Sequence, residues 1–147
     1  MPIRARHLAG VLCLLSAVAL SYVTHLDGED RRPYTETYQF SRGTTFVNGE
    51  ENRLKALGID LLANRHHAVV IVGHTGVGSD DGANRLLSTS RAKATKEILL
   101  DTGLPANRII TVEGLGASQP LQRQPGETER GYQRRLSRVD VNVIYRE

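Results

Sequence analysis

One stretch of the chain carries side chains that could bind a carboxylate. The spacing i, i+3, i+7 and i+10 joins Asn84, Leu87, Arg91 and Ala94. In the helix predicted over residues 82–102, these four residues line one stripe. An arginine guanidinium grips a carboxylate through two parallel hydrogen bonds, so Arg91 is a candidate anion-binding residue, with Asn84 two turns away. The alternative is that Arg91 is an exposed helix arginine and Asn84 a surface or capping residue.

A glycine-rich loop over residues 74–82 precedes this helix. Glycine allows positive φ and a close approach of the backbone to a ligand, so the backbone amides from Thr75 to Asp81 are candidate ligand contacts. The glycine spacing differs by one residue from that of a dinucleotide-binding loop, and the lysine of a phosphate-binding loop is absent. The sequence therefore argues against a nucleotide site.

Histidine and serine side chains around the same loop raise the question of metal binding or catalysis. His66 and His67 precede a predicted strand, and His74 follows it. Two adjacent histidines do not readily ligate one metal ion, and no cysteine or pair of carboxylates accompanies them. Ser88 lacks an acid to orient a histidine beside it, and its position favours packing. We therefore expect no metal, no cofactor and no enzymatic activity.

Short apolar runs and helical periodicity predict the elements that position these residues. Strands are predicted at Tyr38–Phe40, Ala68–Gly73, Ile109–Glu113 and Val139–Tyr145, and helices over residues 50–64 and 82–102. The run Ala68–Gly73 is β-branched and apolar throughout, as expected for a strand covered on both faces. Residues 117–134 read as a polar loop. The alternation of strands and helices favours parallel pairing, with the helices packed on a sheet.

Composition allows one domain with an aliphatic core. The chain has 147 residues, no tryptophan and two phenylalanines, and domains commonly run to about 100–150 residues. Its net charge is +3, with 19 basic and 16 acidic residues. Two of the basic residues, Arg4 and Arg6, belong to the N-terminal segment, and without them the charges almost balance. Nucleic-acid binding is therefore not expected.

The first 26 residues have the pattern of a targeting segment. Arg4 and Arg6 precede an uncharged, largely apolar run over residues 7–26, which is typical of a secretory signal. An uncleaved membrane anchor is the alternative, because about 20 apolar residues just span a bilayer. Cys13 lacks the preceding small residue of a lipoprotein signal, so lipidation is not expected. Residues 27–37 are polar, contain Pro33 and read as a linker.

Several separated motifs together resemble the signature of the OmpA C-terminal domain, whose relatives include Pal lipoproteins and MotB-type motor proteins. The matching residues are Gly73-His74-Thr75, Asn84, Leu87-Ser88, Arg91-Ala92, Gly114–Pro120 and Arg138–Val141. The resemblance implies an α/β fold over residues 38–147, a β-α-β-α-β-β two-layer sandwich with a mixed sheet covered by helices. It also implies binding of peptidoglycan, in which the arginine matching Arg91 holds a carboxylate of the stem peptide, typically on diaminopimelate.

One departure from the family pattern bears directly on this function. The family aspartate that follows Gly-His-Thr, and typically pairs with the diaminopimelate ammonium, falls here on Gly76. A charged hydrogen bond contributes about 1.5–3 kcal/mol, or roughly 10- to 100-fold in affinity. Asp80 or Asp81 could compensate, unless they only complement the dipole of the following helix. Leu136-Ser137 also stands where the family usually has Asn-Arg.

Two hypotheses follow from the resemblance and the departure. In the first, the chain is a non-catalytic cell-envelope protein that binds peptidoglycan stem peptides through Arg91, Asn84, Leu87 and the loop residues Thr75, Gly76, Asp80 and Asp81. In the second, the domain is degenerate and serves as a protein-interaction scaffold in an envelope assembly such as a secretion or motor complex. Both place the domain in the periplasm of a Gram-negative-type envelope, soluble or held to the membrane by its N-terminal segment. Whether it forms a homodimer stays open.

Overall fold

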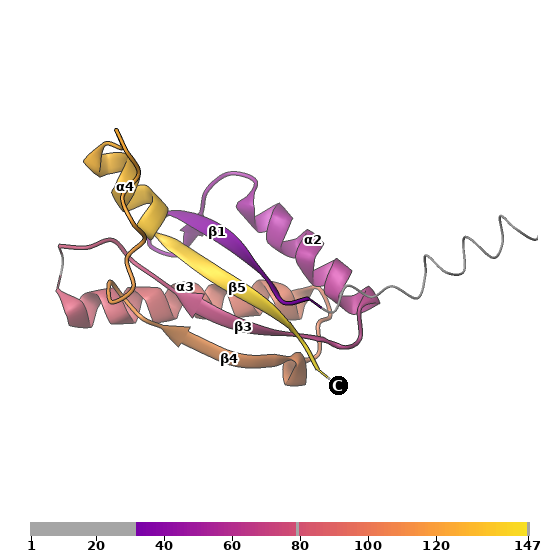
Figure 1. The fold of residues 1–147 in the computed structure, drawn as a ribbon. Helices are drawn as coiled ribbons and strands as arrows, with labels where there is room; N and C mark the ends of the chain where they lie inside the picture. Colours follow the sequence, from indigo (N-terminus) through magenta and orange to yellow (C-terminus); the bar gives the residue numbers. More distant parts are fainter. Residues whose placement is uncertain (1–31, 79, 147) are drawn as a thin grey trace, which may run out of the picture. The chain divides into compact units, whose positions relative to one another are not determined.

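The structure, a computed structural model, describes residues 32–78 and 80–146 of the chain (Figure 1). In chain order the elements are β1 (Tyr34–Arg42), β2 (Thr45–Phe46), α2 (Glu50–Ala63), β3 (His67–Gly73), α3 (Asp81–Asp101), the 3-10 helix η1 (Ala106–Arg108), β4 (Ile109–Gly114), α4 (Glu129–Leu136) and β5 (Arg138–Tyr145). The predicted signal or anchor segment, with Cys13, lies outside the described residues. Among the residues described, no helix is both long and apolar enough to cross a membrane.

One mixed sheet contains all five strands in the order β2-β1-β5-β3-β4. β3 and β4 pair in parallel, as a strand–helix–strand order predicts, because α3 returns the chain to the same end of the sheet. β5 runs antiparallel to both of its neighbours, β1 and β3. The last strand of the domain therefore lies between the first long strand and the parallel pair, and the predicted mixed sheet is confirmed.

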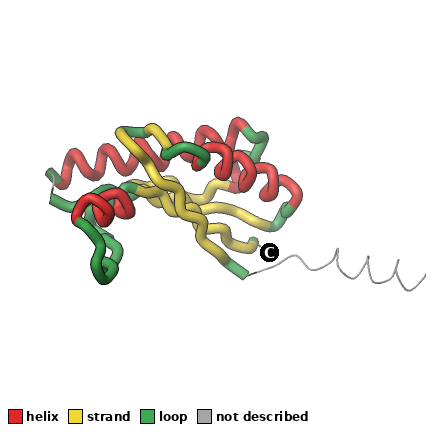
Figure 2. Tube along the Cα trace, turned by 90° about the horizontal axis from the view of Figure 1, so that it is seen from above, coloured by secondary structure: helices red, strands yellow, loops and turns green. Residues whose placement is uncertain are grey.

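Helices α2 and α3 cover one face of the sheet, which gives the predicted two layers (Figure 2). The core between them is mostly aliphatic, as expected from the composition. Its buried residues are Tyr38, Phe40, Leu54, Leu57, Leu61, Val69, Ile71, Ala92, Leu99, Leu104, Val139, Val141 and Val143. The expectation that β3 is covered on both faces was wrong. Val70 and Val72 are only half-buried and pair with the polar residues Asn142 and Asp140 of β5.

The first strand begins earlier than its apolar residues predicted. β1 starts at Tyr34, so the linker predicted over residues 27–37 was wrong for its last four residues. Polar residues extend this strand because its second face is not covered by helices. The hydroxyls of Thr35 and Thr37 donate to the side chains of Asn142 and Asp140 in β5, at 2.7 and 2.8 Å.

A short helix, α4, lies in the segment predicted to be a loop over residues 117–134. The hydroxyl of Thr128 caps its first turn by accepting from the Gly131 amide at 3.1 Å. Leu136 is fully buried, and the Tyr132 hydroxyl donates to the Leu121 carbonyl at 2.8 Å. With only these two apolar anchors in a charged stretch, the helix has too weak a periodicity to be predicted from sequence.

The two long helices begin and end close to the predicted residues. Asp80 is the N-cap of α3, and its carboxylate accepts from the Ala83 amide at 2.7 Å. Gly103 follows the helix with a φ of 94°, a conformation that glycine adopts without strain. Gly58 of α2 has a packing role, because a Cβ there would collide with the side chain of Thr102. The close contact between α2 and α3 therefore requires a glycine.

Candidate functional site

Two glycines at the ends of parallel strands let α3 pack directly on the sheet. Gly73 and Gly114 are register partners in β3 and β4. A Cβ on Gly73 would collide with the backbone of Ser88, and a Cβ on Gly114 with both the Ser88 hydroxyl and the neighbouring backbone. Ser88 itself is fully buried and accepts from the Gly116 amide at 2.9 Å. These contacts fix the first half of α3 beside the loop that follows β3, and Ser88 is a packing residue, as its position indicated.

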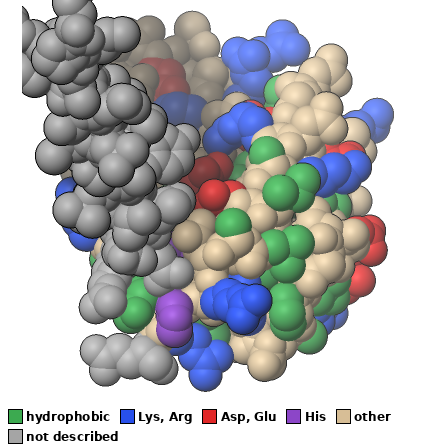
Figure 3. Space-filling view, turned by 90° about the vertical axis from the view of Figure 1, so that its right-hand side faces the viewer, with side chains coloured by type: hydrophobic (Ala, Val, Ile, Leu, Met, Phe, Trp, Pro, Cys, Tyr) green, Lys and Arg blue, Asp and Glu red, His purple; other side chains and the backbone are tan. Residues whose placement is uncertain are grey.

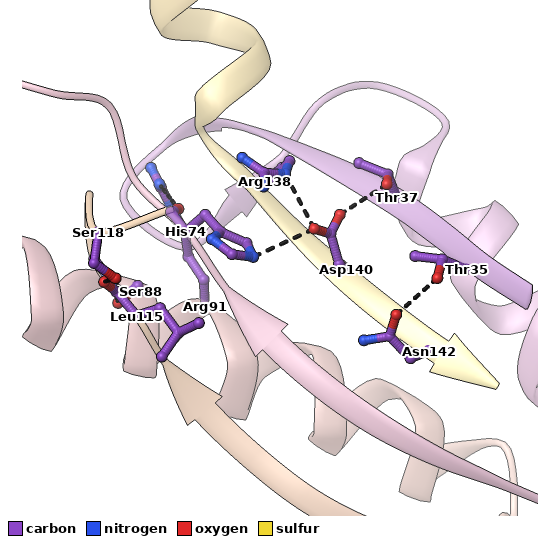
Figure 4. A network of polar contacts seen from close by, with 11 residues as sticks. Thr35, Thr37, His74, Ser88, Arg91, Leu115, Ser118, Arg138, Asp140 and Asn142 are labelled. Atoms are coloured by element: carbon purple, nitrogen blue, oxygen red, sulfur yellow. Dashed lines mark hydrogen bonds and ion pairs between the residues drawn. The ribbon is translucent and has the colours of Figure 1, made fainter. Parts of the chain in front are cut away.

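Arg91 lies beneath this loop and is 4% exposed, so the alternative of an exposed helix arginine was wrong. Its Nε donates to the Gly43 carbonyl at 2.8 Å and its Nη1 to the His74 carbonyl at 3.1 Å. The guanidinium carbon lies 5.2 Å from the centre of the Phe40 ring. Arg91 therefore joins the turn after β1 to the end of β3, and Figure 4 shows its side chain reaching from α3 to His74.

The charge of Arg91 is not balanced within the described residues. None of the described carboxylates lies within 4.0 Å of its guanidinium nitrogens. Burial lowers the pKa of the Arg91 guanidinium, and no charged neighbour opposes that shift. A buried cation without a counter-ion is costly, so this position favours an anionic ligand.

Beside Arg91, a polar cluster forms where β3 ends and β5 begins (Figure 4). His74 Nε2 lies 3.3 Å from Asp140 Oδ2, and Arg138 Nε lies 3.1 Å from the same oxygen. The other oxygen of Asp140 accepts from the Thr37 hydroxyl. Burial raises the pKa of the Asp140 carboxyl, but the hydrogen bonds from His74 and Thr37 and the charge of Arg138 outweigh it. The pKa therefore lies below its usual value.

Three buried polar atoms in this region have no hydrogen-bond partner among the described residues. They are Nδ1 of His74, Oγ1 of Thr75 and Nη1 of Arg138, in side chains that belong to residues 3%, 3% and 5% exposed. Buried polar groups nearly always have a partner. The hydroxyl of Thr75 and the guanidinium of Arg138 are thus donors that a bound carboxylate would satisfy.

The residues predicted from sequence occupy different positions around this cluster. Thr75 is buried, and its amide donates to the Gly116 carbonyl at 3.0 Å. Asn84 is also buried, whereas Gly76 and Leu87 are half-buried. The structure thus brings Thr75 and Arg91 together through the end of β3.

The two acids of the loop are placed differently from each other. Asp80 caps α3 through its carboxylate, whereas Asp81 is exposed in the first turn of the helix. Neither carboxylate forms an ion pair with Arg91 within the described part of the chain. Asp80 therefore has a defined structural role, as the alternative to compensation proposed.

Sequence reasoning missed a contact between α4 and the loop. Oε1 of Gln133 accepts from the Val77 amide at 3.0 Å, and its Nε2 donates to Glu129 at 2.7 Å. A Cβ on Gly76 would collide with this same Oε1. The Gln133 amide thus occupies the space beside Gly76 into which a side chain would extend. Arg138 was also missed as a site residue, although it lies in a motif that carried the resemblance.

The histidines do not form a common site. His66 lies just before β3, His67 is its first residue, and His74 follows its last residue. A whole strand therefore separates the first two histidines from the third. Figure 3 shows one face of the molecule, on which a histidine lies near lysine and arginine side chains. Within residues 32–78 and 80–146 no group of three or more potential ligands could hold a metal ion. Ser88 and His74 form no hydrogen bond to each other, since His74 Nε2 faces Asp140.

Most of the described domain matches a known family. The OmpA family matches residues 39–134, which include α2, α3, the loop after β3 and most of α4. The chain belongs to the OmpA family. This confirms the resemblance inferred from the separated motifs.

Two curated relatives share about a third of their aligned residues with this chain. The outer-membrane lipoprotein YfiB of Pseudomonas aeruginosa is 34% identical over 86 residues, which are 58% of this chain and 51% of the lipoprotein. Outer membrane protein A of Shimwellia blattae is 34% identical over 86 residues, 57% of this chain and 35% of that protein. The chain thus spans about half or less of the length of these relatives.

Solved structures share the fold at lower identity. The peptidoglycan-associated lipoprotein of Burkholderia pseudomallei superimposes with a TM-score of 0.63 at 18% identity, covering 73% of this chain and 88% of the other. A MotB-like protein from Desulfovibrio vulgaris gives a TM-score of 0.62 at 20% identity, covering 89% of each chain. The predicted α/β sandwich with a mixed sheet is therefore confirmed.

Proposed function

We propose that this domain binds peptidoglycan through a carboxylate of the stem peptide and thereby anchors an envelope structure to the cell wall. The observation that supports this proposal best is the buried guanidinium of Arg91, which has no described carboxylate partner. The protein needs no catalytic group for this role, because anchoring is a binding function. The names of the relatives, a peptidoglycan-associated lipoprotein among them, agree with it.

The site contains enough donors for a carboxylate of diaminopimelate. Arg91 supplies the buried positive charge, and the unpartnered Oγ1 of Thr75 and Nη1 of Arg138 lie in the adjacent cluster. A hydrogen bond to a charged group contributes about 1.5–3 kcal/mol. Two such bonds would contribute about 3–6 kcal/mol of the roughly 8 kcal/mol that a micromolar affinity represents, so other contacts with the stem peptide would supply the rest.

The remaining predicted site residues surround these donors. Asn84 and Leu87 lie on α3 two turns and one turn before Arg91, where an amide and an apolar side chain would line the stem peptide. Gly76 lies beside the Gln133 amide, which occupies the space that a side chain would fill. Asp80 and Asp81 are the acids of the loop that could meet an ammonium group. We therefore include all of them in the proposed binding site.

We also propose the periplasm of a Gram-negative-type envelope as the location of the domain. The named relatives are outer-membrane proteins or lipoproteins, and the N-terminal segment predicts export. The segment would hold the domain to the membrane if it is retained. Envelope proteins, including a second copy of this chain, are further candidate partners.

Co-sedimentation of the full chain with purified sacculi tests the proposal. Arg91→Lys keeps the charge but loses the fork, and Arg91→Gln loses the charge. Arg65→Lys is the matched control, since Arg65 is exposed and makes no hydrogen bond within the described residues. We expect the wild type and the control to pellet, and Arg91→Gln to remain in the supernatant. Circular dichroism of each variant verifies that the fold survives, because Arg91 also bonds two backbone carbonyls.

Competition with a soluble ligand separates specific binding from adhesion. A free stem tetrapeptide that contains diaminopimelate should release the wild type from sacculi. If the wild type fails to pellet, or pellets equally with Arg91→Gln, the proposal is refuted. The absence of binding would favour the scaffold hypothesis, whose supporting observation is that Gly76 and Gln133 leave no acid at the family's aspartate position.

A further inference from the structure

The charge of the site is unevenly distributed. Arg91 and Arg138 are both buried cations, at 4% and 5% exposure. Asp140 is the carboxylate in contact with the cluster, and it already accepts from Thr37, Arg138 and His74. The site therefore has an excess of donors for an anion. It has little free acceptor capacity for a cation.

The loop acids are poorly placed to correct this balance. The Asp80 carboxylate accepts from the Ala83 amide as the N-cap of α3, and loss of such a cap typically costs about 1 kcal/mol. Asp81 is exposed to solvent in the first turn of the helix, where it complements the helix dipole. A ligand ammonium at Gly76 would thus require either a broken cap or a rearranged helix start.

A neutral amide occupies the position beside Gly76. Gln133 Oε1 accepts from the Val77 amide, and Nε2 donates to Glu129. An amide has two donor hydrogens and two acceptor lone pairs, so Gln133 retains one of each. A second amide can satisfy both, whereas an ammonium offers only donors. The nearby Glu129 carboxylate is already engaged by the Gln133 amide and by Arg123.

We infer that Gln133 determines the specificity of this site, selecting stem peptides whose diaminopimelate side-chain amine is acylated, as it is in a peptide cross-link. The inference rests on the proposed binding of the stem peptide. In such a ligand the carboxylate remains for Arg91, while the nitrogen is a neutral amide that matches Gln133. The domain would therefore bind cross-linked wall material in preference to free stems.

Calorimetric titration of the full chain in mild detergent with two synthetic tetrapeptides tests this inference. One carries diaminopimelate with a free side-chain amine, and the other carries the same residue with that amine acetylated. We expect the wild type to bind the acetylated peptide about 10-fold more tightly. The ammonium of the other peptide loses hydration on binding without gaining a partner, whereas the acetylated nitrogen carries no charge. Gln133→Glu has nearly the same shape but adds a carboxylate, so it should favour the free amine by a similar factor.

Gln122→Glu provides the matched control. Its side chain is exposed and makes no hydrogen bond within the described residues, so the same added charge should leave the wild-type preference unchanged. Equal affinities for the two peptides, or tighter binding of the free amine by the wild type, would overturn the inference and leave the proposed function standing. In the latter case Asp80 or Asp81 supplies the counter-charge. Failure of the wild type to bind either peptide would overturn both proposals.

Discussion

Replacing Gly76 with alanine should have opposite effects in two backgrounds. The φ of Gly76 is not positive, so alanine introduces no backbone strain there. Its Cβ, however, would collide with Oε1 of Gln133, and Gln133 would have to leave the Val77 amide. In a Gln133→Ala background the collision is absent. The sign of the effect therefore reports whether Gln133 occupies this space in solution.

The expected magnitude follows from the contacts that are lost. Displacing Gln133 removes its hydrogen bond to Val77 and perturbs the one to Glu129, which together cost about 1–2 kcal/mol. Against this, glycine-to-alanine at a compatible φ stabilises by about 0.4–1 kcal/mol through the unfolded chain. We expect Gly76→Ala to destabilise the wild type by roughly 0.5–1 kcal/mol. In Gln133→Ala it should stabilise by about 0.5 kcal/mol.

Urea unfolding followed by far-UV circular dichroism measures both effects, since the chain has no tryptophan. The double-mutant cycle should give a coupling of about 1–1.5 kcal/mol, well above the 0.3–0.5 kcal/mol scatter of independent sites. A cycle of Gly76→Ala with Gln122→Ala is the control and should be additive. The same change in unfolding free energy in both Gln133 backgrounds would refute the proposed contact.

Three further predictions concern charged side chains. Arg108→Ala should lower the unfolding free energy by about 2–4 kcal/mol, because its guanidinium donates to three backbone carbonyls at the ends of α2 and β3; Arg65→Ala, in a urea titration alongside, should change it by less than about 0.5 kcal/mol. Arg135→Ala should raise the pKa of Glu127 from about 2 towards its ordinary value in an NMR titration, since the hydrogen bond from Arg135 is the largest cause of the lowered pKa. An unchanged pKa would show that the pair does not form. The pKa of Asp140 is below its ordinary value, so the ionised carboxylate stabilises the folded state above about pH 4, and this stabilisation is lost as the pH falls through the folded pKa. The free energy of unfolding, measured from pH 5 to 2, should therefore depend less on pH in Asp140→Asn, and an identical profile would contradict the assignment.

Strong local patterns were sufficient to predict most of the fold. The apolar run of β3 and the strict alternation of β5 define strands without tertiary information. The limits of α3 follow from its cap at Asp80 and its stop at Gly103. Weaker patterns failed where tertiary contacts decide the structure. Thr35 and Thr37 look like linker residues until their hydroxyls pair with β5 across the uncovered face of the sheet.

The candidate site was predictable only in part. Spacing and family motifs identified Arg91, but a lone arginine in a helix gives no sign of burial, and its two carbonyl partners belong to other elements. Gln133 lies 56 residues from its partner Val77, in a helix whose existence was not apparent from sequence. No local signal identifies such a contact, because it depends on how α4 packs against the loop.

The direction of β1 has a mechanical consequence. β1 and β3 each run antiparallel to β5, so they point the same way, and the polar cluster at the end of β3 lies at the opposite end of the sheet from Arg32. A force between Arg32 and a bound ligand therefore acts along β1 rather than across it. The hydrogen bonds of β1 to β5, over the register from Tyr34 to Gln39, would share that load in shear. Under tension the domain would have to break them together, whereas a strand peeled from its edge loses them one at a time.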